Sequence, residues 1–539
     1  MRNRFFVTTA IDYVNAEPHL GNAYEKIVTD CLARFHRQMG EETFFLTGTD
    51  EHGIKIARAA DQGGESPQQF ADRLSTRFRE VYDALDISYD RFVRTTEPAH
   101  ERAVQEWFRR AYKSGFIYPA EYEGPYCVAC EAFYQPKDLK PGDLCPVHDR
   151  PIQILKENNF FFRLSAFGDR LRDLILKNTE FVLPEIRRNE VMKFIEDGLQ
   201  DVSVTRASVS WGVQVPSEIE NAGGQTIYVW FDALLNYITA IGFPDEDYLQ
   251  WWLKPGADGS PGDEPNALHI IGKDISRFHC LIWPAMLMAA DLPLPRSIFV
   301  HGFIQMGGEK LSKTAGRMLD PIEVTERYGV DALRYYILRE VPFGRDGEFS
   351  WDQLVERYNT DLANELGNLV SRSCSMLNRY RDGEVPSSWD PQEREREVRE
   401  LAGNVSDKVQ KAYGRHQPSV ALEAVWTLVK RANRYVEESR PWDLAKQPDQ
   451  AKRLDTVLGT LLECARLAGL WSWPATPKKS EELWQGLALT GSPGATRPEE
   501  AKKRWQWFEG NETPTEAGRK ISEVKILFPK IEVPVGPEA

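Results

Sequence analysis

Two short motifs in this chain combine residue types that bind phosphate. The first, HLGN at residues 19–22, follows an apolar stretch at 5–10 that predicts a strand, and it opens a predicted helix. The second, KLSKT at 310–314, lies in a Gly-rich loop after a predicted strand at 298–300. A helix N-terminus offers unpaired N–H groups and partial positive charge to a phosphate. Two lysines on a loop can neutralise a departing polyphosphate. Together the motifs predict a site that uses ATP to transfer adenylate.

Four side chains of these motifs are the candidates for the phosphate chemistry: His19, Asn22, Lys310 and Lys313. Each motif alone has an ordinary alternative, because a histidine before a helix is often only a cap and a KxSK sequence occurs by chance. Both occur here at the ends of predicted strands and in the expected order, which favours the catalytic interpretation.

A second constellation has the spacing of a metal site. The pair Cys127 and Cys130 is followed, after fourteen residues, by Cys145 and His148. Two close pairs joined by a loop supply a tetrahedral, thiolate-rich ligand set, which selects zinc. All four positions carry ligands and none is open, so we expect one structural Zn²⁺. The alternative is a set of cysteines without metal.

Length and composition limit the class of protein. A chain of 539 residues is too long for one core, so several domains are expected. No apolar run reaches the length of a membrane span and no export signal is present, and the odd total of seven cysteines argues against a disulfide framework. We therefore expect a cytoplasmic protein without a membrane partner. The net charge of −14 argues mildly against nucleic acid as the main ligand, but a local basic stripe would suffice.

The periodicity of apolar residues changes along the chain. Strand and helix alternate over residues 4–60, which predicts a parallel sheet with its ligand site at the carboxyl ends of the strands. The pattern resumes at 225–310, with strands expected at 226–230, 267–271 and 297–300 and a helix at 278–288. From about residue 320 the spacing is helical almost throughout, which predicts a helical bundle after an α/β domain.

These motifs resemble those of the class I aminoacyl-tRNA synthetases, and further stretches resemble the methionyl-tRNA synthetases. The matching stretches are AIDY at 10–13, FLTGTDEHG at 45–53, YVWFDA at 228–233, IGKD at 271–274 and RPW at 440–442. The resemblance implies ATP-dependent activation of L-methionine, with Mg²⁺, and transfer to the 3′ end of tRNA(Met), both initiator and elongator. His19, Gly21, Asn22, Gly272, Asp274, Lys310 and Lys313 are then the expected ATP-binding residues.

The resemblance also implies an organisation into domains. A Rossmann-like parallel-sheet catalytic domain is expected at 1–117 and 223–320, divided by an inserted connective module with the zinc knuckle at 118–222. A stem-contact linker is expected at 321–355, a helical anticodon-binding domain at 356–490, and a linker and tail that pack back on the body at 491–539.

A pocket for methionine is the next implication. A thioether is apolar with a weakly accepting sulfur, so its pocket needs aromatic walls and one or two donors. Core packing is the alternative for each aromatic residue, and the resemblance favours the pocket. Asp50 is expected to hold the substrate's ammonium. The other expected pocket residues are Ile11, Tyr13, Trp230, Ala233, Leu234, Tyr237, Ile275 and His279.

One position departs from the family. Its first motif usually ends in a second histidine, and this chain has Asn22 there. An asparagine donates to a phosphate oxygen but carries no positive charge. We still expect an active enzyme, because neutral donors suffice at many such sites.

Three residues of the helical region match the residues that read the CAU anticodon in the family. Asn368 and Arg372 are four residues apart on one predicted helix and so share a face, and Trp442 lies near the end of another helix. An amide, a guanidinium and an indole can stack on single-stranded bases and read their edges. Without the resemblance, a solvated face and a core tryptophan are the ordinary interpretations.

Three other functions compete with this prediction: a class I synthetase for cysteine, leucine, isoleucine or valine, a zinc-dependent RNA-binding protein without catalysis, and a nucleotidyltransferase that ligates small molecules. The aromatic pocket and the absence of a large editing insertion favour methionine. Because the chain ends soon after its predicted bundle, we expect a monomer.

Overall fold

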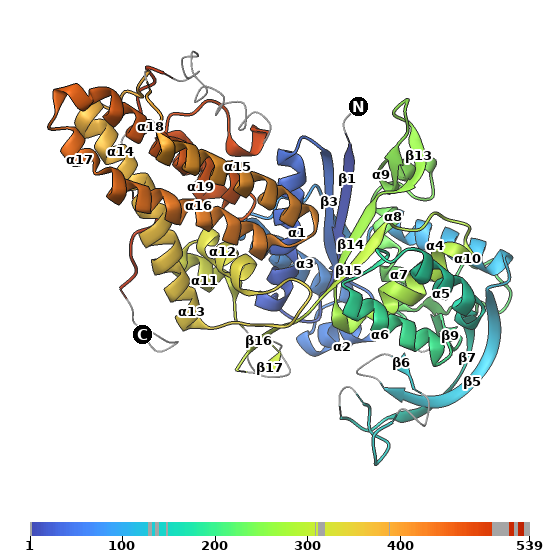
Figure 1. The fold of residues 1–539 in the computed structure, drawn as a ribbon. Coiled ribbons are helices and arrows are strands. Elements are labelled where there is room, and N and C mark those ends of the chain that lie inside the picture. Colours follow the sequence, from blue (N-terminus) through green and yellow to red (C-terminus); the bar gives the residue numbers. More distant parts are fainter. Residues whose placement is uncertain are drawn as a thin grey trace.

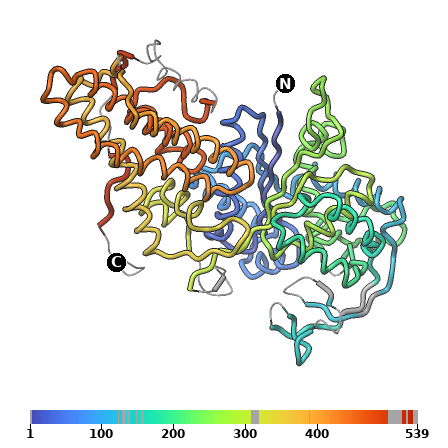
Figure 2. The backbone as a smooth tube through the Cα atoms, viewed as in Figure 1, coloured from blue at the N-terminus to red at the C-terminus, as the bar shows by residue number. Residues whose placement is uncertain are grey.

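A computed structural model gives the fold (Figures 1 and 2). It describes residues 3–127, 132–134, 139–146, 149–207, 209–307, 309–310, 319–387, 389–497, 517–521 and 526–532. Figure 1 shows a central sheet with the antiparallel strands β5 and β7 at one end of the molecule and a group of long helices at the other.

The central sheet has seven strands within the described residues, and every recorded pairing is parallel. Its order is β2 (Asp12–Tyr13), β3 (Glu42–Asp50), β1 (Arg4–Thr9), β14 (Ala267–Gly272), β15 (Ser297–His301) and β8 (Val182–Leu183), and β4 (Arg91–Arg94) also pairs with β3. The predicted parallel α/β sheet is thus confirmed, and its carboxyl edge collects residues from segments more than 200 positions apart.

Alternation along the strands divides the core into two parts. Phe5 and Val7 of β1 belong to one buried cluster, and Phe6 between them belongs to the other. Successive side chains of a strand point to opposite faces, so each cluster covers one face of the sheet. The first face carries α1 (Leu20–Gln38), and the second carries α4 (Pro98–Lys113) and α10 (Trp283–Ala289).

A second, antiparallel sheet lies within the predicted connective module. Its strand order is β6 (Ala132–Phe133), β5 (Ile117–Cys127), β7 (Gln153–Phe162) and β9 (Val202–Ser203). The helices α5 (Gly168–Lys177) and α6 (Glu185–Glu196) follow in the same stretch. Strand β8 belongs to this stretch in sequence, yet it pairs with β15, so the stretch also contributes a strand to the central sheet.

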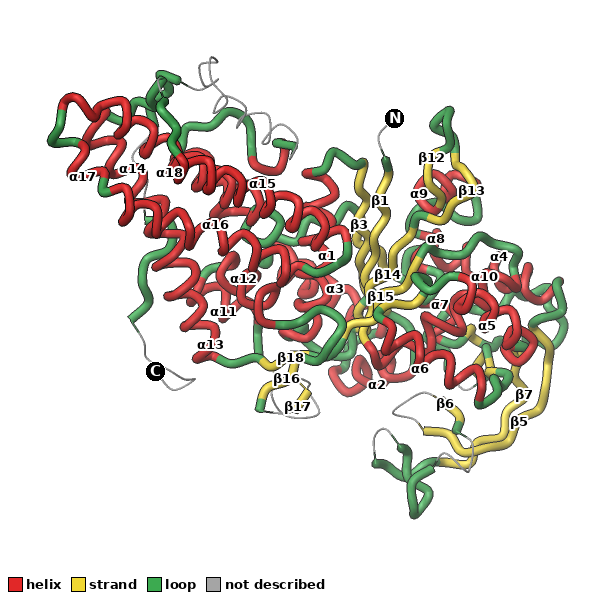
Figure 3. Tube along the Cα trace, in the orientation of Figure 1, coloured by secondary structure: helices red, strands yellow, loops and turns green. Residues whose placement is uncertain are grey.

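The second half of the chain is helical, as the apolar periodicity predicts (Figure 3). Its helices are α11 (Pro321–Tyr328), α12 (Val330–Glu340), α13 (Trp351–Arg357), a π-helix (Tyr358–Gly367), α14 (Asn368–Arg381), α15 (Glu393–Gly414), α16 (Pro418–Ser439), α17 (Pro441–Leu444), α18 (Ala451–Ser472) and α19 (Pro477–Gly486). Further along, Phe528 is buried and its ring meets that of Tyr358 edge to face at 5.9 Å.

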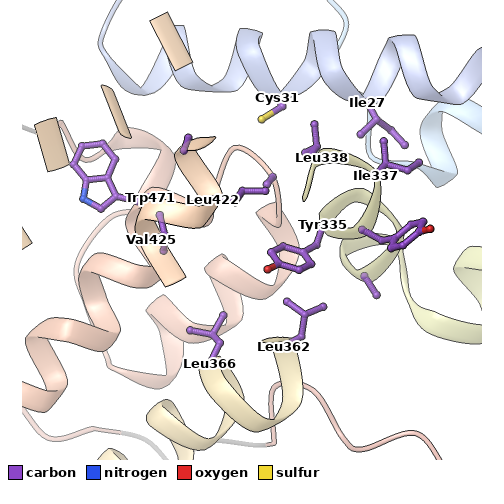
Figure 4. Close-up of a cluster of buried hydrophobic side chains, with 14 of the residues drawn as sticks. Ile27, Cys31, Tyr335, Ile337, Leu338, Leu362, Leu366, Leu422, Val425 and Trp471 are labelled. Atoms are coloured by element: carbon purple, nitrogen blue, oxygen red, sulfur yellow. The ribbon is translucent and has the colours of Figure 1, made fainter. Parts of the chain in front are cut away.

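Helix α1 belongs to both halves of the molecule. Its residues Ile27 and Cys31 share one cluster with Tyr335 of α12 and with helices of the bundle (Figure 4). At its end the Gln38 amide donates to the carbonyl oxygens of Leu470 at 2.8 Å and of Pro493 at 3.1 Å. Since both faces of this helix are covered, it is buried over almost its whole length.

One expected strand is wrong. The chain is extended only at β11 (Thr226–Ile227), which pairs with β10 (Thr205–Arg206), and α7 (Val229–Ala233) begins two residues later. Valine and aromatic residues favour strands on average, but tertiary packing here places Trp230 on a helix. The strands expected at 267–271 and 297–300 are confirmed as β14 and β15, and the helix expected at 278–288 forms the π-helix Phe278–Ile282 and α10.

Candidate active site

A cavity of about 400 Å³ opens at the carboxyl edge of the central sheet, beside the start of α1. It collects residues from β2, from the ends of β3, β14 and β15, and from α7. Every ATP or methionine residue predicted from the sequence, apart from the two lysines, lines it: Ile11, Tyr13, His19, Gly21, Asn22, Asp50, Trp230, Ala233, Leu234, Tyr237, Gly272, Asp274, Ile275 and His279. Segments that the sequence separates by more than 250 residues therefore share one concave surface.

The first motif forms the N-terminal cap of α1. The Nδ1 atom of His19 accepts the Gly21 backbone N–H at 3.0 Å, and the Asn22 Oδ1 accepts the His19 backbone N–H at 3.1 Å. Because Nδ1 is an acceptor, the neutral His19 ring carries its proton on Nε2, which can donate to a phosphate. The cap and the candidate phosphate ligands are the same side chains.

The described residues on either side of the second motif have recorded backbone pairings. The backbone of Lys310, in β17 (Glu309–Lys310), pairs with Gln305 of β16 (Ile304–Met306), and Ile304 lines the cavity. Past the motif, the carbonyl of Leu319 accepts the backbone N–H of Leu20 at 3.0 Å, next to His19. The rest of the motif, including Lys313, lies outside the described residues. The chain directly after the second motif therefore lies at the start of α1.

The predicted ribose residues meet where β14 ends. A Cβ atom built on Gly272 would lie 2.8 Å from the Asp274 carboxylate, so a larger residue here would displace that carboxylate. His301, at the end of β15, lies within van der Waals distance of the same point. This crowding leaves the Asp274 carboxylate at the wall of the cavity, where it can accept from hydroxyl groups.

The predicted methionine pocket has a polar pair at its base. The Tyr237 hydroxyl lies 2.7 Å from His279 Nε2, and His279 Nδ1 lies 3.0 Å from the carbonyl oxygen of Ile275. Burial lowers the pKa of His279 to about 4, so the ring is neutral, donates from Nδ1 and accepts the tyrosine proton at Nε2. Trp230 stacks on Phe278 with ring centroids 4.0 Å apart and supplies an apolar wall.

A buried ion pair connects two walls of the pocket. His52, two residues after Asp50, places Nδ1 2.6 Å from Asp232 Oδ2, and His100 Nε2 lies 2.8 Å from the other carboxylate oxygen. Asp232 lies on α7 between Trp230 and Ala233, and it is fully buried. Burial alone would raise the pKa of Asp232, but the two histidines outweigh it and lower the pKa to about 2. The ion pair holds α7 against the end of β3.

Because of the His52–Asp232 ion pair, we expect the free energy of unfolding to decrease as pH rises. Burial alone would lower the pKa of His52, but the Asp232 carboxylate outweighs it and raises the pKa above its usual value. A histidine whose pKa is raised on folding stabilises fully below its unfolded pKa of about 6.5, and the contribution disappears as pH rises through the folded value. Urea unfolding from pH 6 upward should show the difference in free energy between wild type and H52Q shrinking. A constant difference would contradict the assignment.

Several ionisable residues at the cavity were missed in the sequence analysis. Asp12, Glu25, Lys26 and His301 line it and are each at least nine-tenths buried. The available signal was their spacing, since Lys26 follows Asn22 by four residues and Glu25 by three, which places them beside it on the helix. Residue type alone gave no reason to distinguish them from charged side chains on a solvent-exposed helix face.

The predicted zinc ligands are described only in part. Cys127 ends β5 and Cys145 lies in a tight turn closed by a hydrogen bond from its N–H to the Arg150 carbonyl at 2.8 Å; both thiols are buried and neither forms a disulfide. Cys130 and His148 lie outside the described residues. Among the residues that are described, no group of three or more potential ligands could hold a metal ion.

The predicted RNA-reading residues lie in the helical half. Asn368 and Arg372 are on α14, and the Arg372 guanidinium pairs with Glu437 of α16 at 2.6 Å. Helix α16 ends at Ser439 and leads into α17, which carries the half-buried Trp442. The ion pair places α14 beside the end of α16, and Figure 1 shows α14 and α17 at the end of the molecule away from β5 and β7.

Within the described residues, no helix combines the length and apolar character that crossing a bilayer requires.

A parallel α/β sheet with the first motif at its carboxyl edge is the arrangement expected of a class I tRNA synthetase, and comparison with protein families agrees. The sequence model of the family "tRNA synthetases class I (M)" matches residues 5–149 and 134–374. The methionine–tRNA ligase of Caldanaerobacter subterraneus is 41% identical over 536 residues, which cover 99% of this chain and 80% of the relative. That of Streptomyces coelicolor is 40% identical over 539 residues, 98% of this chain and 97% of the relative.

Solved structures point the same way. The Mycobacterium tuberculosis methionyl-tRNA synthetase in complex with methionyl-adenylate superposes with a TM-score of 0.88 at 39% identity, covering 98% of this chain and 100% of that one. Its apo form gives a TM-score of 0.84 at 37% identity, covering 99% of both chains. The chain belongs to the methionine–tRNA ligase family of class I tRNA synthetases.

Proposed function

We propose that this protein activates L-methionine with ATP and Mg²⁺ to form methionyl-adenylate and pyrophosphate, and then transfers the methionyl group to the 3′ end of initiator and elongator tRNA(Met). The observation that carries the proposal is the convergence of the predicted nucleotide and amino-acid residues on one cavity at the carboxyl edge of the sheet. Its place of action is the cytoplasm, and it acts as a monomer.

The first step is an in-line attack of the methionine carboxylate on the α-phosphorus of ATP. Catalysis of this kind depends on positioning and on charge stabilisation. His19 Nε2, the Asn22 amide and the N-terminus of α1 donate to the phosphate oxygens. Lys310 and Lys313 neutralise the leaving pyrophosphate, and Asp274 accepts from the ribose hydroxyls.

Recognition of methionine uses the opposite wall of the cavity. Asp50 accepts the substrate ammonium, and Trp230 with its neighbours encloses the apolar side chain. The Tyr237 hydroxyl and the His279 ring share one hydrogen bond at 2.7 Å, which fixes their orientation next to the position of the sulfur. A rigid pocket discriminates between substrates whose side chains differ by one methylene by only about 1–3 kcal/mol of binding free energy. Shape and the ammonium contact must therefore act together.

The deciding experiment is amino-acid-dependent ATP–pyrophosphate exchange by the purified protein with each of the twenty amino acids. Exchange that depends on methionine is expected. Exchange with cysteine, leucine, isoleucine or valine instead would replace this proposal by another class I specificity, and no exchange with any amino acid would leave an RNA-binding protein without catalysis.

Zinc is part of the proposal. Cys127, Cys130, Cys145 and His148 would hold one structural Zn²⁺, and the burial of the two described thiols fits a thiolate site. Chelation should release one zinc per chain, measured by atomic absorption, and should increase proteolysis within residues 120–160 while cleavage elsewhere stays unchanged. Protein purified without chelators that contains no zinc would contradict this prediction.

Arg372 is proposed to read the anticodon together with Asn368 and Trp442. Its replacement by alanine should lower kcat/KM for aminoacylation of tRNA(Met) by about 5- to 150-fold, the loss typical of one base-reading arginine, and leave ATP–pyrophosphate exchange unchanged. R396A is the matched control, since Arg396 is 66% exposed and pairs with Glu393 on α15. Equal losses in both reactions for R372A would indicate misfolding or a wrong assignment.

A further inference from the structure

Hydrogen bonds at both its oxygen and its nitrogen fix the side-chain amide of Asn22. Its Oδ1 accepts the backbone N–H of His19 at 3.1 Å, and its Nδ2 donates to Asp12 Oδ1 at 2.7 Å. A carboxylate accepts only and a backbone N–H donates only, so the amide has one possible orientation. An amide nitrogen carries two hydrogens, and Asp12 takes one of them. The other remains for a ligand in the cavity that Asn22 lines.

Asp12 is itself held by a buried lysine. The ammonium of Lys26 lies 2.7 Å from Asp12 Oδ2, and the Tyr82 hydroxyl donates to the same oxygen. Lys26 is 2% exposed and lies one helical turn after Asn22 on α1. The two oxygens of Asp12 thus face Asn22 on one side and the cation on the other.

The three N–H groups of Lys26 are all used within the protein. Besides Asp12, its ammonium meets the carbonyl oxygen of Ala10 at 2.9 Å and Glu25 Oε1 at 3.2 Å. A lysine ammonium has three donors, so none is left for a substrate. Its charge therefore acts on the cavity through its partners.

The negative charge of Asp12 needs a compensating positive charge, and Lys26 supplies it. A carboxylate within hydrogen-bonding distance of a phosphate-binding amide repels a polyphosphate, and burial weakens the screening by water. An opposite charge at 2.7 Å from one Asp12 oxygen compensates this repulsion, while the other oxygen still accepts from Asn22.

We propose that Asp12 and Lys26 are positioning residues for adenylate formation: Asp12 orients the Asn22 amide so that its second N–H donates to ATP, and Lys26 cancels the repulsion that the Asp12 carboxylate would otherwise exert on the triphosphate. The inference rests on the proposed function, and it explains how a neutral residue serves at position 22.

The action of Asp12 through Asn22 is tested by a double-mutant cycle. N22A should lower kcat for methionine-dependent exchange by roughly 100-fold, as for the loss of one donor at a developing charge. D12N keeps the shape of the side chain and replaces the carboxylate by a neutral acceptor, which should lower kcat about tenfold, since charge-assisted hydrogen bonds are the stronger ones. In the N22A background D12N should change kcat by less than about twofold, because coupled residues are non-additive. Equal effects of D12N in both backgrounds would overturn the inference.

The action of Lys26 is tested by restoring neutrality. K26M should raise KM for ATP about tenfold and leave KM for methionine within about twofold, because an uncompensated carboxylate then faces the phosphates. D12N/K26M removes the charges of Asp12 and Lys26, while Glu25 keeps its contact with His301 at 2.9 Å, and it should return KM for ATP to within about threefold of wild type. A general loss of folding would lower the apparent kcat without raising KM for ATP selectively, and a second substitution would not rescue it. K254M is the control, since Lys254 pairs with Glu264 at 2.8 Å on the surface.

The outcomes separate this inference from the proposed function. The affinity for a non-hydrolysable ATP analogue, measured by calorimetry without an amino acid, should be lower for K26M than for wild type. D12N/K26M should restore it to near the wild-type value. If wild type exchanges with an amino acid other than methionine, the proposed specificity fails and this comparison still applies. Analogue binding that K26M leaves unchanged, or that D12N/K26M does not restore, would overturn the inference. Melting temperatures of all variants identify any that are unfolded, in which case the D12N cycle decides.

Discussion

Replacing Arg334 by leucine should lower the free energy of unfolding by about 3–5 kcal/mol, the cost of removing one partner of a buried ion pair. Arg334 on α12 is 0% exposed and its Nη2 lies 2.6 Å from Asp30 Oδ2 on α1. The same guanidinium donates to the carbonyl oxygens of Leu85, Pro474 and Ala475 at 3.0–3.2 Å. Leucine would leave a buried carboxylate and three carbonyls without this donor.

Urea unfolding followed by tryptophan fluorescence and by circular dichroism measures this loss. R434L is the control, because Arg434 is 78% exposed and its pair with Glu438 one turn along α16 should contribute only about 0.3–0.5 kcal/mol. Burial alone would raise the pKa of Asp30, but Arg34 and Arg334 outweigh it and hold the pKa below its usual value. Equal stability losses for R334L and R434L would show that the buried guanidinium is not the connection that we assign to it.

Asp50→Asn should raise KM for methionine by about 1.5 to 3.5 orders of magnitude, which corresponds to the 2–5 kcal/mol lost when one partner of a buried, hydrogen-bonded charge pair is removed. The Asp50 carboxylate is 7% exposed and lines the cavity at the end of β3. In the variant, the substrate ammonium loses its ionic acceptor in a place that water screens poorly.

A substrate analogue isolates this effect. 4-(Methylsulfanyl)butanoate has the methionine side chain and carboxylate but no amine, so it should inhibit wild type and D50N equally weakly. Competitive inhibition of methionine-dependent exchange gives both constants. A D50N variant that weakens the analogue as much as methionine, or that changes KM for methionine less than about threefold, would remove Asp50 from the proposed ammonium site.

The sheet could be predicted from the sequence where strands are buried on both faces. The stretches ALHIIG at 267–272 and SIFVH at 297–301 are nearly continuous apolar runs, which is the pattern of a covered parallel strand. The stretch at 226–230 has similar residue types but becomes a helix after two extended residues. Local preference is the same in the three segments, and only the packing of α7 against its neighbours distinguishes them.

Most of the cavity residues that belong to motifs were predictable, but Asp12 was missed although it lies in the AIDY stretch at 10–13, and Glu25 and Lys26 belong to no motif. His19, Asp50 and Trp230 lie in stretches that resemble the family, and the structure places them at one cavity. Lys26 and Glu25 look like ordinary charged residues of a helix exposed on one side. They are buried because α1 is enclosed by the sheet and by α12 and the bundle, which no local pattern reveals.

The position of α1 between the two halves has a mechanical consequence. A helix of 19 residues is a stiff rod of about 28 Å, so tilting it by only ~2° about its far end displaces its tip by ~1 Å. The far end is bonded through Gln38 to Leu470 and Pro493, and the tip carries His19. A displacement of ~1 Å at reacting groups can change a rate by about 10²-fold. A change in the packing of the helices at 451–495 that tilts α1 would therefore displace its tip, where the proposed phosphate ligands lie.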